Sequence, residues 1–135
     1  MKYLLDTNTC IAALRNRGPI EVRRRLEVCV PGDLAVCSIV RLELLVGALR
    51  SAAPESNTQR VQQFPRGLES IAMDDRIADA AAPVRAVLEA NGTPIGPHDL
   101  LIAATALVHG LVLVTSDLEF ARVPGLTVED WRVVL

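Results

Sequence analysis

Four acidic side chains lie beside apolar runs of the chain, at positions where their carboxylates could bind one divalent cation. Asp6 ends the first apolar run, and Asp117 comes two residues after the run that finishes at Thr115. Glu43 and Asp99 lie in the opening turns of two expected helices. Carboxylates within a few ångströms of one another repel and raise each other's pKa, and a bound divalent cation relieves that repulsion.

The chemistry of such a cluster follows from its ligand atoms. Oxygen ligands suit Mg²⁺ or Mn²⁺, and the chain has no set of cysteines and histidines with the spacing of a zinc site. A carboxylate-held Mg²⁺ lowers the pKa of an attacking water and neutralises charge that builds on a phosphate. The four acids therefore point to hydrolysis of a phosphodiester bond.

Each acid taken singly also has a structural explanation. An Asp after a strand is often a turn residue, and an Asp in the first turn of a helix complements the helix dipole. Glu43 fits this explanation worst, because it lies between Leu42 and Leu44 in a largely apolar segment, where an unpaired carboxylate is costly.

Apolar runs and turn residues predict the elements that position these acids. Strands are expected at 2–5, 34–37, 68–73, 111–115 and 126–128, and helices at 8–15, 20–28, 38–49, 57–64, 74–90 and 97–109. Continuously apolar strands separated by helices predict a parallel sheet covered on both faces, a three-layer α/β/α sandwich that residues 1–135 form as one domain. Such sheets bind ligands beyond the carboxyl ends of their strands, where the strand order reverses. All four acids fall at that end.

Local signals add detail to the helices. Asn8 and Ser38 are expected to be N-caps. Within the 38–49 helix, an apolar stripe at helical spacing is expected to face the core, and its members are Leu42, Leu45, Val46 and Leu49. The three arginines at 23–25 are expected to form a solvated helix face, and Trp131 to pack the C-terminal segment.

Composition excludes several classes of function. Of the 135 residues, 50% are hydrophobic and 22% are charged, which is typical of a globular protein. Aromatic residues make up only 3%, which excludes a base-stacking surface, and the net charge of −2 argues against a histone-like binder. Cys10, Cys29 and Cys37 lie in apolar runs and are expected to be small buried hydrophobes in a reducing cytoplasm.

Four segments, in order along the chain, carry a resemblance to a known family. These segments are 3–8 (YLLDTN), 41–48 (RLELLVGA), 93–104 (TPIGPHDLLIAA) and 114–117 (VTSD). They resemble the motifs of the PIN-domain ribonucleases, and more closely those of the VapC toxins of bacterial toxin–antitoxin pairs. The resemblance runs over essentially the whole chain, including the ending at 123–131.

The resemblance implies a PIN-like fold and a metal-dependent endoribonuclease that cuts structured RNA such as tRNA or rRNA. It implies that one or two Mg²⁺ or Mn²⁺ ions are held by four acids, Asp6, Glu43, Asp99 and Asp117. Supporting polar positions of the family are matched by Asn8, Thr115 and Ser116. Glu119 is an alternative to Asp117 or shares its role, because this chain has a shorter turn there than its close relatives.

The resemblance also implies partners, a VapB-type antitoxin and a second copy of the chain in a homodimer. An anionic pocket that attracts a metal also attracts a guanidinium, which pairs bidentately with carboxylates. We therefore expect an antitoxin Arg to enter beside the acids and displace the metal. An apolar segment of the antitoxin is expected to lie over the early helices, around Leu14 and Leu45.

Two other classes of function compete with this interpretation. Asp6 followed by Thr7 is similar to the nucleophile of the haloacid-dehalogenase-like phosphatases, which need a second Asp where this chain has Asn8. A non-catalytic PIN-like interaction domain would lack one of the acids, and all four are present. His98 precedes Asp99, but the sequence shows no partner for it, and a surface histidine at a helix start is the simpler interpretation.

Overall fold

The strands of the chain form one sheet, in which every pairing between neighbours is parallel. The computed structural model describes residues 1–15, 20–64 and 67–132. Its strands are β1 (Tyr3–Leu5), β2 (Leu34–Cys37), β3 (Glu69–Ile71), β4 (Val112–Val114) and β5 (Val128–Glu129). They lie in the order β3-β2-β1-β4-β5. The α/β class and the parallel sheet predicted from the apolar runs are therefore confirmed.

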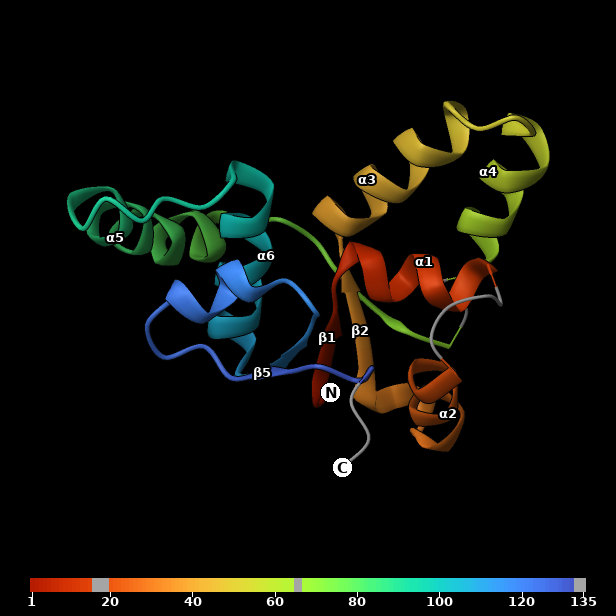
Figure 1. The fold of residues 1–135 in the computed structure, drawn as a ribbon, viewed down its shortest axis with the longest axis horizontal. Helices are drawn as coiled ribbons and strands as arrows, with labels where there is room; N and C mark the ends of the chain where they lie inside the picture. Colours follow the sequence, from red (N-terminus) through yellow and green to blue (C-terminus); the bar gives the residue numbers. More distant parts are fainter. Residues whose placement is uncertain (16–19, 65–66, 133–135) are drawn as a thin grey trace.

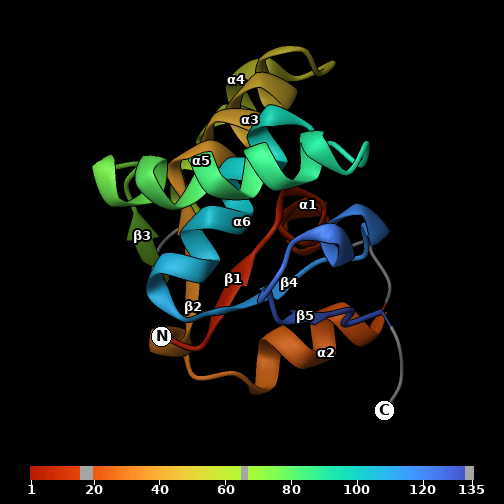
Figure 2. The same ribbon diagram turned by 90° about the vertical axis from the view of Figure 1, so that its left-hand side faces the viewer.

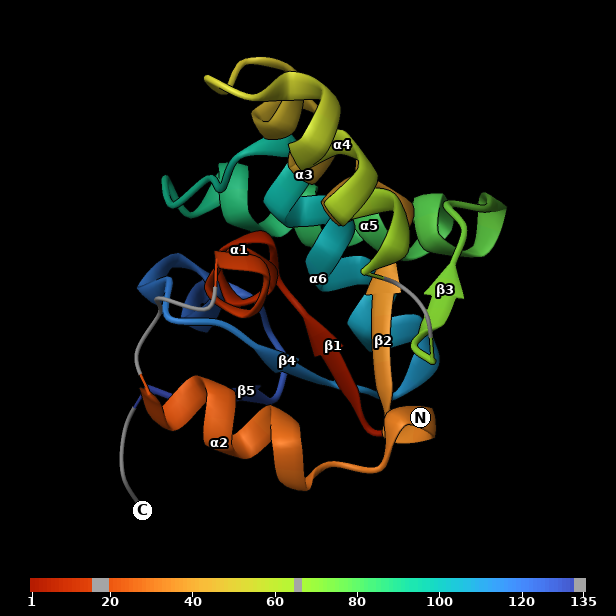
Figure 3. The ribbon, with the colours of Figure 1, turned by 90° about the vertical axis from the view of Figure 1, so that its right-hand side faces the viewer.

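The helices cover the sheet on both faces. They are α1 (Thr7–Arg15), α2 (Ile20–Val28), α3 (Ser38–Leu49), α4 (Pro54–Gln63), α5 (Asp75–Ala90) and α6 (Pro97–His109), with short 3₁₀ turns η1 (Pro31–Asp33) and η2 (Leu118–Arg122). Figure 1 shows α5 and α6 on one side of the strands and α1 and α2 on the other. Figure 2 places α5 and α6 toward the viewer, and Figure 3 does the same for α1 and α2.

The strand order reverses beside β1. The chain builds β1, β2 and β3 toward one edge of the sheet and then returns through α5 and α6 to place β4 on the other side of β1. In the register of the sheet, Leu4 lies opposite both Ala35 and Leu113, and all three are fully buried. Central strands covered on both faces account for the lack of polar alternation in their sequences.

Two helix boundaries follow the expected signals. Asp74 caps α5, because its Oδ1 accepts a hydrogen bond from the backbone N–H of Ile77 over 3.1 Å. At the other end of the next helix, Gly110 has a φ of 64°, which is the left-handed conformation that glycine adopts at low cost.

Two expected caps are wrong, for one reason. Helix α1 begins at Thr7, and its cap is the Asp6 carboxylate, which accepts from the backbone N–H of Thr9 over 2.8 Å. Asn8 is therefore inside the helix. Ser38 is the first residue of α3, and its hydroxyl donates to the Ile71 carbonyl over 3.4 Å. In both places β-strand and helix join without an intervening turn, so the residue at the strand's end precedes the helix.

The expected inward face of α3 is also wrong. The side chains that α3 buries are Val40, Leu44 and Ala48, at spacings of four residues. Three members of the predicted stripe, Leu42, Val46 and Leu49, are 47%, 37% and 64% exposed. The sequence of α3 is apolar on more than one side, so periodicity alone offers two stripes, and packing against the neighbouring elements selects one of them.

The α3–α4 hairpin extends beyond the carboxyl ends of the strands. Figure 1 shows α3 leaving the end of β2 and α4 returning beside it, above α1. The two helices pack on each other, and α3 also contacts α1 and α6. This hairpin therefore forms one wall of the region above the strand ends, opposite α6.

The C-terminal segment is anchored by Trp131, as predicted. Its ring is 2% exposed and meets the ring of Tyr3 edge-on, with centroids 5.1 Å apart. Arg25 lies 5.0 Å above the same ring and pairs with Glu129 over 3.1 Å. The prediction of a wholly solvated arginine face is therefore wrong at Arg25, because the guanidinium stacks on an aromatic face.

The cysteines remain thiols. Cys10 and Cys37 are buried and Cys29 is half-buried. Burial raises the pKa of the Cys10 thiol well above its ordinary value, and the Asp6 charge adds to that effect. Among the described residues, no helix is long and apolar enough to cross a membrane.

Candidate functional site

The ends of β1 and β4 meet where the strand order reverses, and each carries one of the predicted acids just beyond it. The backbone N–H of Asp6 donates to the Val114 carbonyl over 3.1 Å. The hydroxyl of Thr9 donates to the same carbonyl over 3.2 Å. These two bonds hold the start of α1 against the end of β4, so that Asp6 and the loop after Val114 lie side by side.

Asp6 is fixed by its role as a helix cap. Its side chain is buried, with the residue only 4% exposed, and its Oδ1 is held by the Thr9 N–H. The other carboxylate oxygen takes no part in this bond. A buried carboxylate with one oxygen held by a backbone N–H has a defined orientation, which a metal ligand requires.

Three further acids converge on the same end of the sheet. They are Asp99 in the first turn of α6, Asp117 just before η2, and Glu119 within η2. Each offers a carboxylate oxygen, and these atoms lie within 4.8 Å of one another. Asp99 and Asp117 are half-buried, while Glu119 is exposed. The sequence left Asp117 and Glu119 as alternatives, and the structure brings both to Asp99.

The loop after β4 is held in shape by hydrogen bonds between near neighbours. The Thr115 hydroxyl accepts from the backbone N–H of Asp117 over 3.1 Å, and Thr115 itself is buried. In turn, the Asp117 Oδ1 accepts from the backbone N–H of Glu119 over 2.9 Å. Ser116, between Thr115 and Asp117 in the chain, is half-buried. Thr115 thus fixes the backbone from which Asp117 projects, which fits the supporting role expected of it.

The electrostatic state of Asp99 shows how closely the acids are gathered. Its pKa is raised to about 6, first by burial and then by the negative charges of Asp117, Glu43, Glu119 and Asp6. Four other carboxylates therefore act on Asp99, and one of them is Glu119. Negative charges near a carboxyl disfavour its ionised form, which is the repulsion expected of such a cluster.

Glu43 contributes a carboxylate with an incomplete set of hydrogen bonds. It lies in the second turn of α3, and its Oε1 is buried without a hydrogen-bond partner among the described residues. The Nδ1 of His98 lies 3.9 Å from this oxygen, which is longer than a hydrogen bond. A buried carboxylate oxygen without a donor is costly unless a cation or a solvent molecule completes it.

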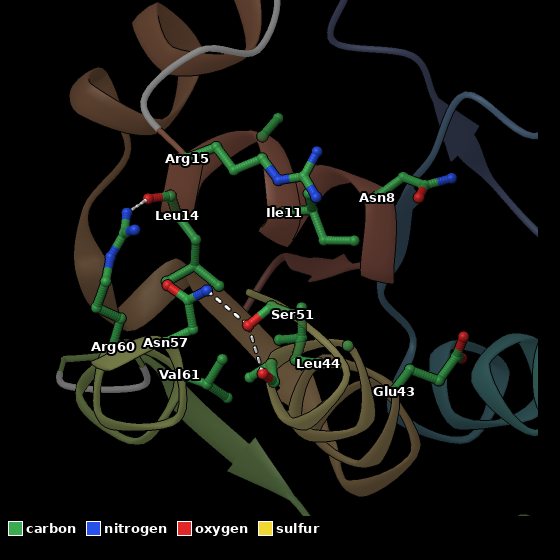
Figure 4. A pocket seen from close by; sticks show the side chains of 13 residues that line it. Asn8, Ile11, Leu14, Arg15, Glu43, Leu44, Ser51, Asn57, Arg60 and Val61 are labelled. Atoms are coloured by element: carbon green, nitrogen blue, oxygen red, sulfur yellow. Dashed lines mark hydrogen bonds between the residues drawn. The ribbon is translucent and has the colours of Figure 1, made fainter. Parts of the chain in front are cut away.

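Two polar residues behave differently from the expectations of the sequence. Asn8 is exposed and lines a groove, and Figure 4 shows its side chain pointing away from Ile11. His98 was expected to be a surface residue without a partner, but the structure places it opposite Glu43. No sequence signal locates this contact, because it depends on how α3 and α6 approach each other.

A groove of about 750 Å³ leads away from Glu43 between α1, α3 and α4. Its apolar walls include Ile11, Leu14, Leu44 and Val61. Figure 4 shows Glu43 at one end and Arg60 at the other, where the Arg60 guanidinium donates to the Leu14 carbonyl. Asn57 donates to the Ser51 hydroxyl over 2.8 Å on the same wall. The groove thus has an apolar middle, an acidic end and a basic end.

The donor set of the acidic cluster fits a divalent cation. Every candidate ligand atom is a carboxylate oxygen, and Mg²⁺ and Mn²⁺ prefer oxygen. Burial, and then the charges of the neighbouring acids, raises the pKa of Asp99. A cation at this place would relieve the repulsion and complete the ligand shell.

Comparison with known proteins gives consistent similarities over nearly the whole chain. The PIN domain family matches residues 3–126. The chain is 42% identical over 132 residues to the tRNA(fMet)-specific endonuclease VapC of Salmonella typhimurium, covering 97% of this chain and 98% of that protein. It is 37% identical, with the same coverage, to the tRNA(fMet)-specific endonuclease VapC of Shigella flexneri.

Solved structures show the same similarity. The fold superimposes with a TM-score of 0.89 on a chain of the DNA-bound VapBC complex from Salmonella typhimurium, at 42% identity and with 97% of this chain and 98% of that chain covered. A chain of the VapBC2 complex from Rickettsia felis, bound to a promoter DNA fragment, gives a TM-score of 0.86 at 34% identity, covering 96% of this chain and 98% of that chain.

The raised pKa of Asp99 predicts how pH acts on the metal-free protein. A carboxyl whose pKa rises from about 4 when unfolded to about 6 when folded favours folding below the lower value and loses that contribution as pH rises through the higher one. In EDTA, Asp99→Asn should melt close to the parent near pH 4 and at a higher temperature near pH 7. Thermal denaturation across this range measures the difference.

Two further variants serve as controls for that measurement. Asp79→Asn, on the exposed side of α5, should show no such pH dependence. Asp6→Ala should instead melt at a lower temperature, because loss of a helix cap lowers the free energy of unfolding by about 1 kcal/mol. Asp6→Asn keeps a capping oxygen. An Asp99→Asn protein that is less stable than its parent near pH 7 would show that Asp99 is a structural partner rather than a source of repulsion.

Proposed function

The chain belongs to the PIN-domain family, among the VapC-type ribonuclease toxins, and from this premise we propose that it hydrolyses RNA with a divalent cation held by its acidic cluster. Asp6, Glu43, Asp99 and Asp117 are the proposed ligands, with Glu119 at hand beside Asp117. The observation that supports the proposal most is the convergence of Asp99, Asp117 and Glu119, whose carboxylate oxygens lie within 4.8 Å of one another. Burial, and then the charges of Asp117, Glu43, Glu119 and Asp6, raises the pKa of Asp99 to about 6.

The chain's own residues orient the reaction. Asp6 is held by the first turn of α1, and Asp117 by the loop that Thr115 fixes. When bound, Mg²⁺ or Mn²⁺ would lower the pKa of an attacking water and neutralise charge on the phosphate. The acidic residues around it repel other anions, so an RNA phosphate enters only where a cation balances the cluster. Thr115, Ser116 and Asn8 are the proposed supporting polar residues, and Asn8 is exposed and lines the groove beside Glu43.

The proposed substrate is structured RNA, cut in a single-stranded part. Two relatives that match 97% of this chain are named tRNA(fMet)-specific endonucleases. We take initiator tRNA as the substrate to test first, with ribosomal RNA as the alternative. Protein recognition of RNA relies on loops and shape, so a folded tRNA is the appropriate probe. The proposed place of action is the cytoplasm, where these RNAs function.

The first test is cleavage of tRNA(fMet) by the purified protein. The parent should cut it in Mg²⁺ or Mn²⁺ and not in EDTA. Asp6→Asn should lower the rate by at least about a hundredfold, the size of loss that follows removal of one preorganised electrostatic group. Asp79→Asn should cut at the parental rate. Cleavage that persists in EDTA, or in Asp6→Asn, would contradict the metal mechanism.

A VapB-type antitoxin is the partner of this toxin, since the similar solved structures are VapBC complexes. We propose that an apolar segment of the antitoxin occupies the groove and that one of its arginines reaches the acids past Glu43. The predicted contact at Leu14 lies in the groove, while Leu44 lines it in place of Leu45. A guanidinium would pair with the carboxylates and exclude the cation.

A substitution inside the groove should separate inhibition from catalysis. Ile11 is half-buried in the groove wall, and Ile11→Glu should weaken antitoxin binding at least about tenfold by placing a charge against an apolar segment, with tRNA cleavage unchanged. Val28→Glu, on exposed α2 and 79% exposed in the parent, is the matched control. Calorimetry measures the affinity. Antitoxin Arg→Ala variants that still inhibit fully would contradict inhibition through the acidic pocket.

We also propose that the toxin forms a homodimer through α3. Leu42, Val46 and Leu49 form an exposed apolar stripe at spacings of four and three residues, on a different face of α3 from Leu44, which lines the groove. Residues at this spacing pack helix against helix, and a two-fold axis through the stripe would place it against its own copy.

Loss of that stripe should give a monomer. Val46→Glu should sediment and scatter light as a monomer at concentrations where the parent is a dimer, because it places two like charges in the interface. Val28→Glu should remain dimeric. Light scattering checks this outcome, and a parent protein that is monomeric at assay concentrations would rule the dimer out.

A further inference from the structure

His98 and Glu43 face each other across the junction of α3 and α6. The His98 Nδ1 and the Glu43 Oε1 are 3.9 Å apart, and their side chains are 51% and 32% exposed. We propose that His98 is a positioning residue, whose neutral imidazole donates from Nδ1–H to this oxygen and thereby turns the second oxygen of Glu43 toward the acidic cluster.

The unsatisfied oxygen of Glu43 is the observation that requires a donor. Oε1 is buried and accepts no hydrogen bond from the described residues. A buried carboxylate oxygen left in this state costs the desolvation of the group. The Nδ1 of His98 lies 3.9 Å from this oxygen, and the two atoms must approach by about 1 Å to reach a hydrogen-bond length. Its half-exposed ring has the freedom for that movement.

The location of His98 suits this role. It occupies the second position of α6, directly before Asp99, so the turn that carries one acid of the cluster also carries the donor to another. The contact therefore links the α3 acid to the α6 acid. A hydrogen bond to the outer oxygen of a ligating carboxylate fixes the orientation of the inner one, and loss of such a bond commonly weakens metal binding tenfold to a hundredfold. This inference rests on the proposed function only in treating Glu43 as a cation ligand.

The test uses side chains that reproduce one ring nitrogen at a time. In His98→Asn the amide nitrogen occupies the place of Nδ1, and in His98→Gln it reaches about as far as Nε2. His98→Ala removes both. With Mn²⁺ as the probe at one fixed pH, His98→Asn should bind within about twofold of the parent, while His98→Gln and His98→Ala should bind at least about tenfold more weakly. Electron paramagnetic resonance of unbound Mn²⁺ measures the affinities.

A second readout needs no metal. Long-range ¹H–¹⁵N spectra of the metal-free protein report which nitrogen of the neutral His98 ring carries the proton. The Nδ1–H form should dominate in the parent and lose its dominance in Glu43→Leu, which has no acceptor. Equal Mn²⁺ affinity in all His98 variants, or an Asn variant as weak as the Ala variant, would overturn the proposal. A dominant Nε2–H form in the parent would also overturn it.

The two readouts separate this inference from the proposed function. A parent protein that binds no Mn²⁺ would contradict the metal mechanism, while the tautomer measurement would still decide whether His98 donates to Glu43. Melting temperatures of the three variants in EDTA identify any loss of affinity that comes from unfolding.

Discussion

Repulsion among carboxylates at one end of the sheet is the constraint on which the rest of this structure depends. Burial, and then the negative charges of four neighbouring acids, raises the pKa of Asp99 to about 6. Without a counter-ion, repulsion destabilises a fold that places such groups together. Two of the acids, Asp6 and Asp117, each accept a hydrogen bond from a backbone N–H. These hydrogen bonds hold the two carboxylates in place against that repulsion.

The parallel sheet supplies the position and the helix termini supply the orientation. Because β1 and β4 are neighbours on either side of the reversal, the residues that follow them emerge together. Asp6 then caps α1, and Asp117 caps η2, so that one oxygen of each is held by a backbone N–H. The α3–α4 hairpin brings Glu43 from a third direction and leaves a groove beside it. Catalysis and inhibition thus use adjoining parts of one surface.

Much of this arrangement could be predicted from the sequence. The parts that could not be predicted depend on how helices and strands join and pack against one another. Apolar runs locate the strands, because a strand buried on both faces has no polar alternation, and the acids follow from their places at the strand ends. The inward face of α3 could not be predicted, since its sequence offers two apolar stripes. The caps of α1 and α3 could not be predicted, because strand and helix join at both places without an intervening turn. The contact of His98 with Glu43, like the approach of Glu119 to Asp99, depends on the angle between elements far apart in the chain.

The most direct test of the account is a crystal structure of the metal-free protein soaked in Mn²⁺, with the anomalous signal of manganese recorded. The account predicts an anomalous peak at bonding distance, about 2.0–2.2 Å, from carboxylate oxygens of Asp6 and Asp99, with Asp117 or Glu43 completing the shell. A peak elsewhere on the molecule, with these acids bonded only to water, would contradict the central claim that their crowding is resolved by a cation.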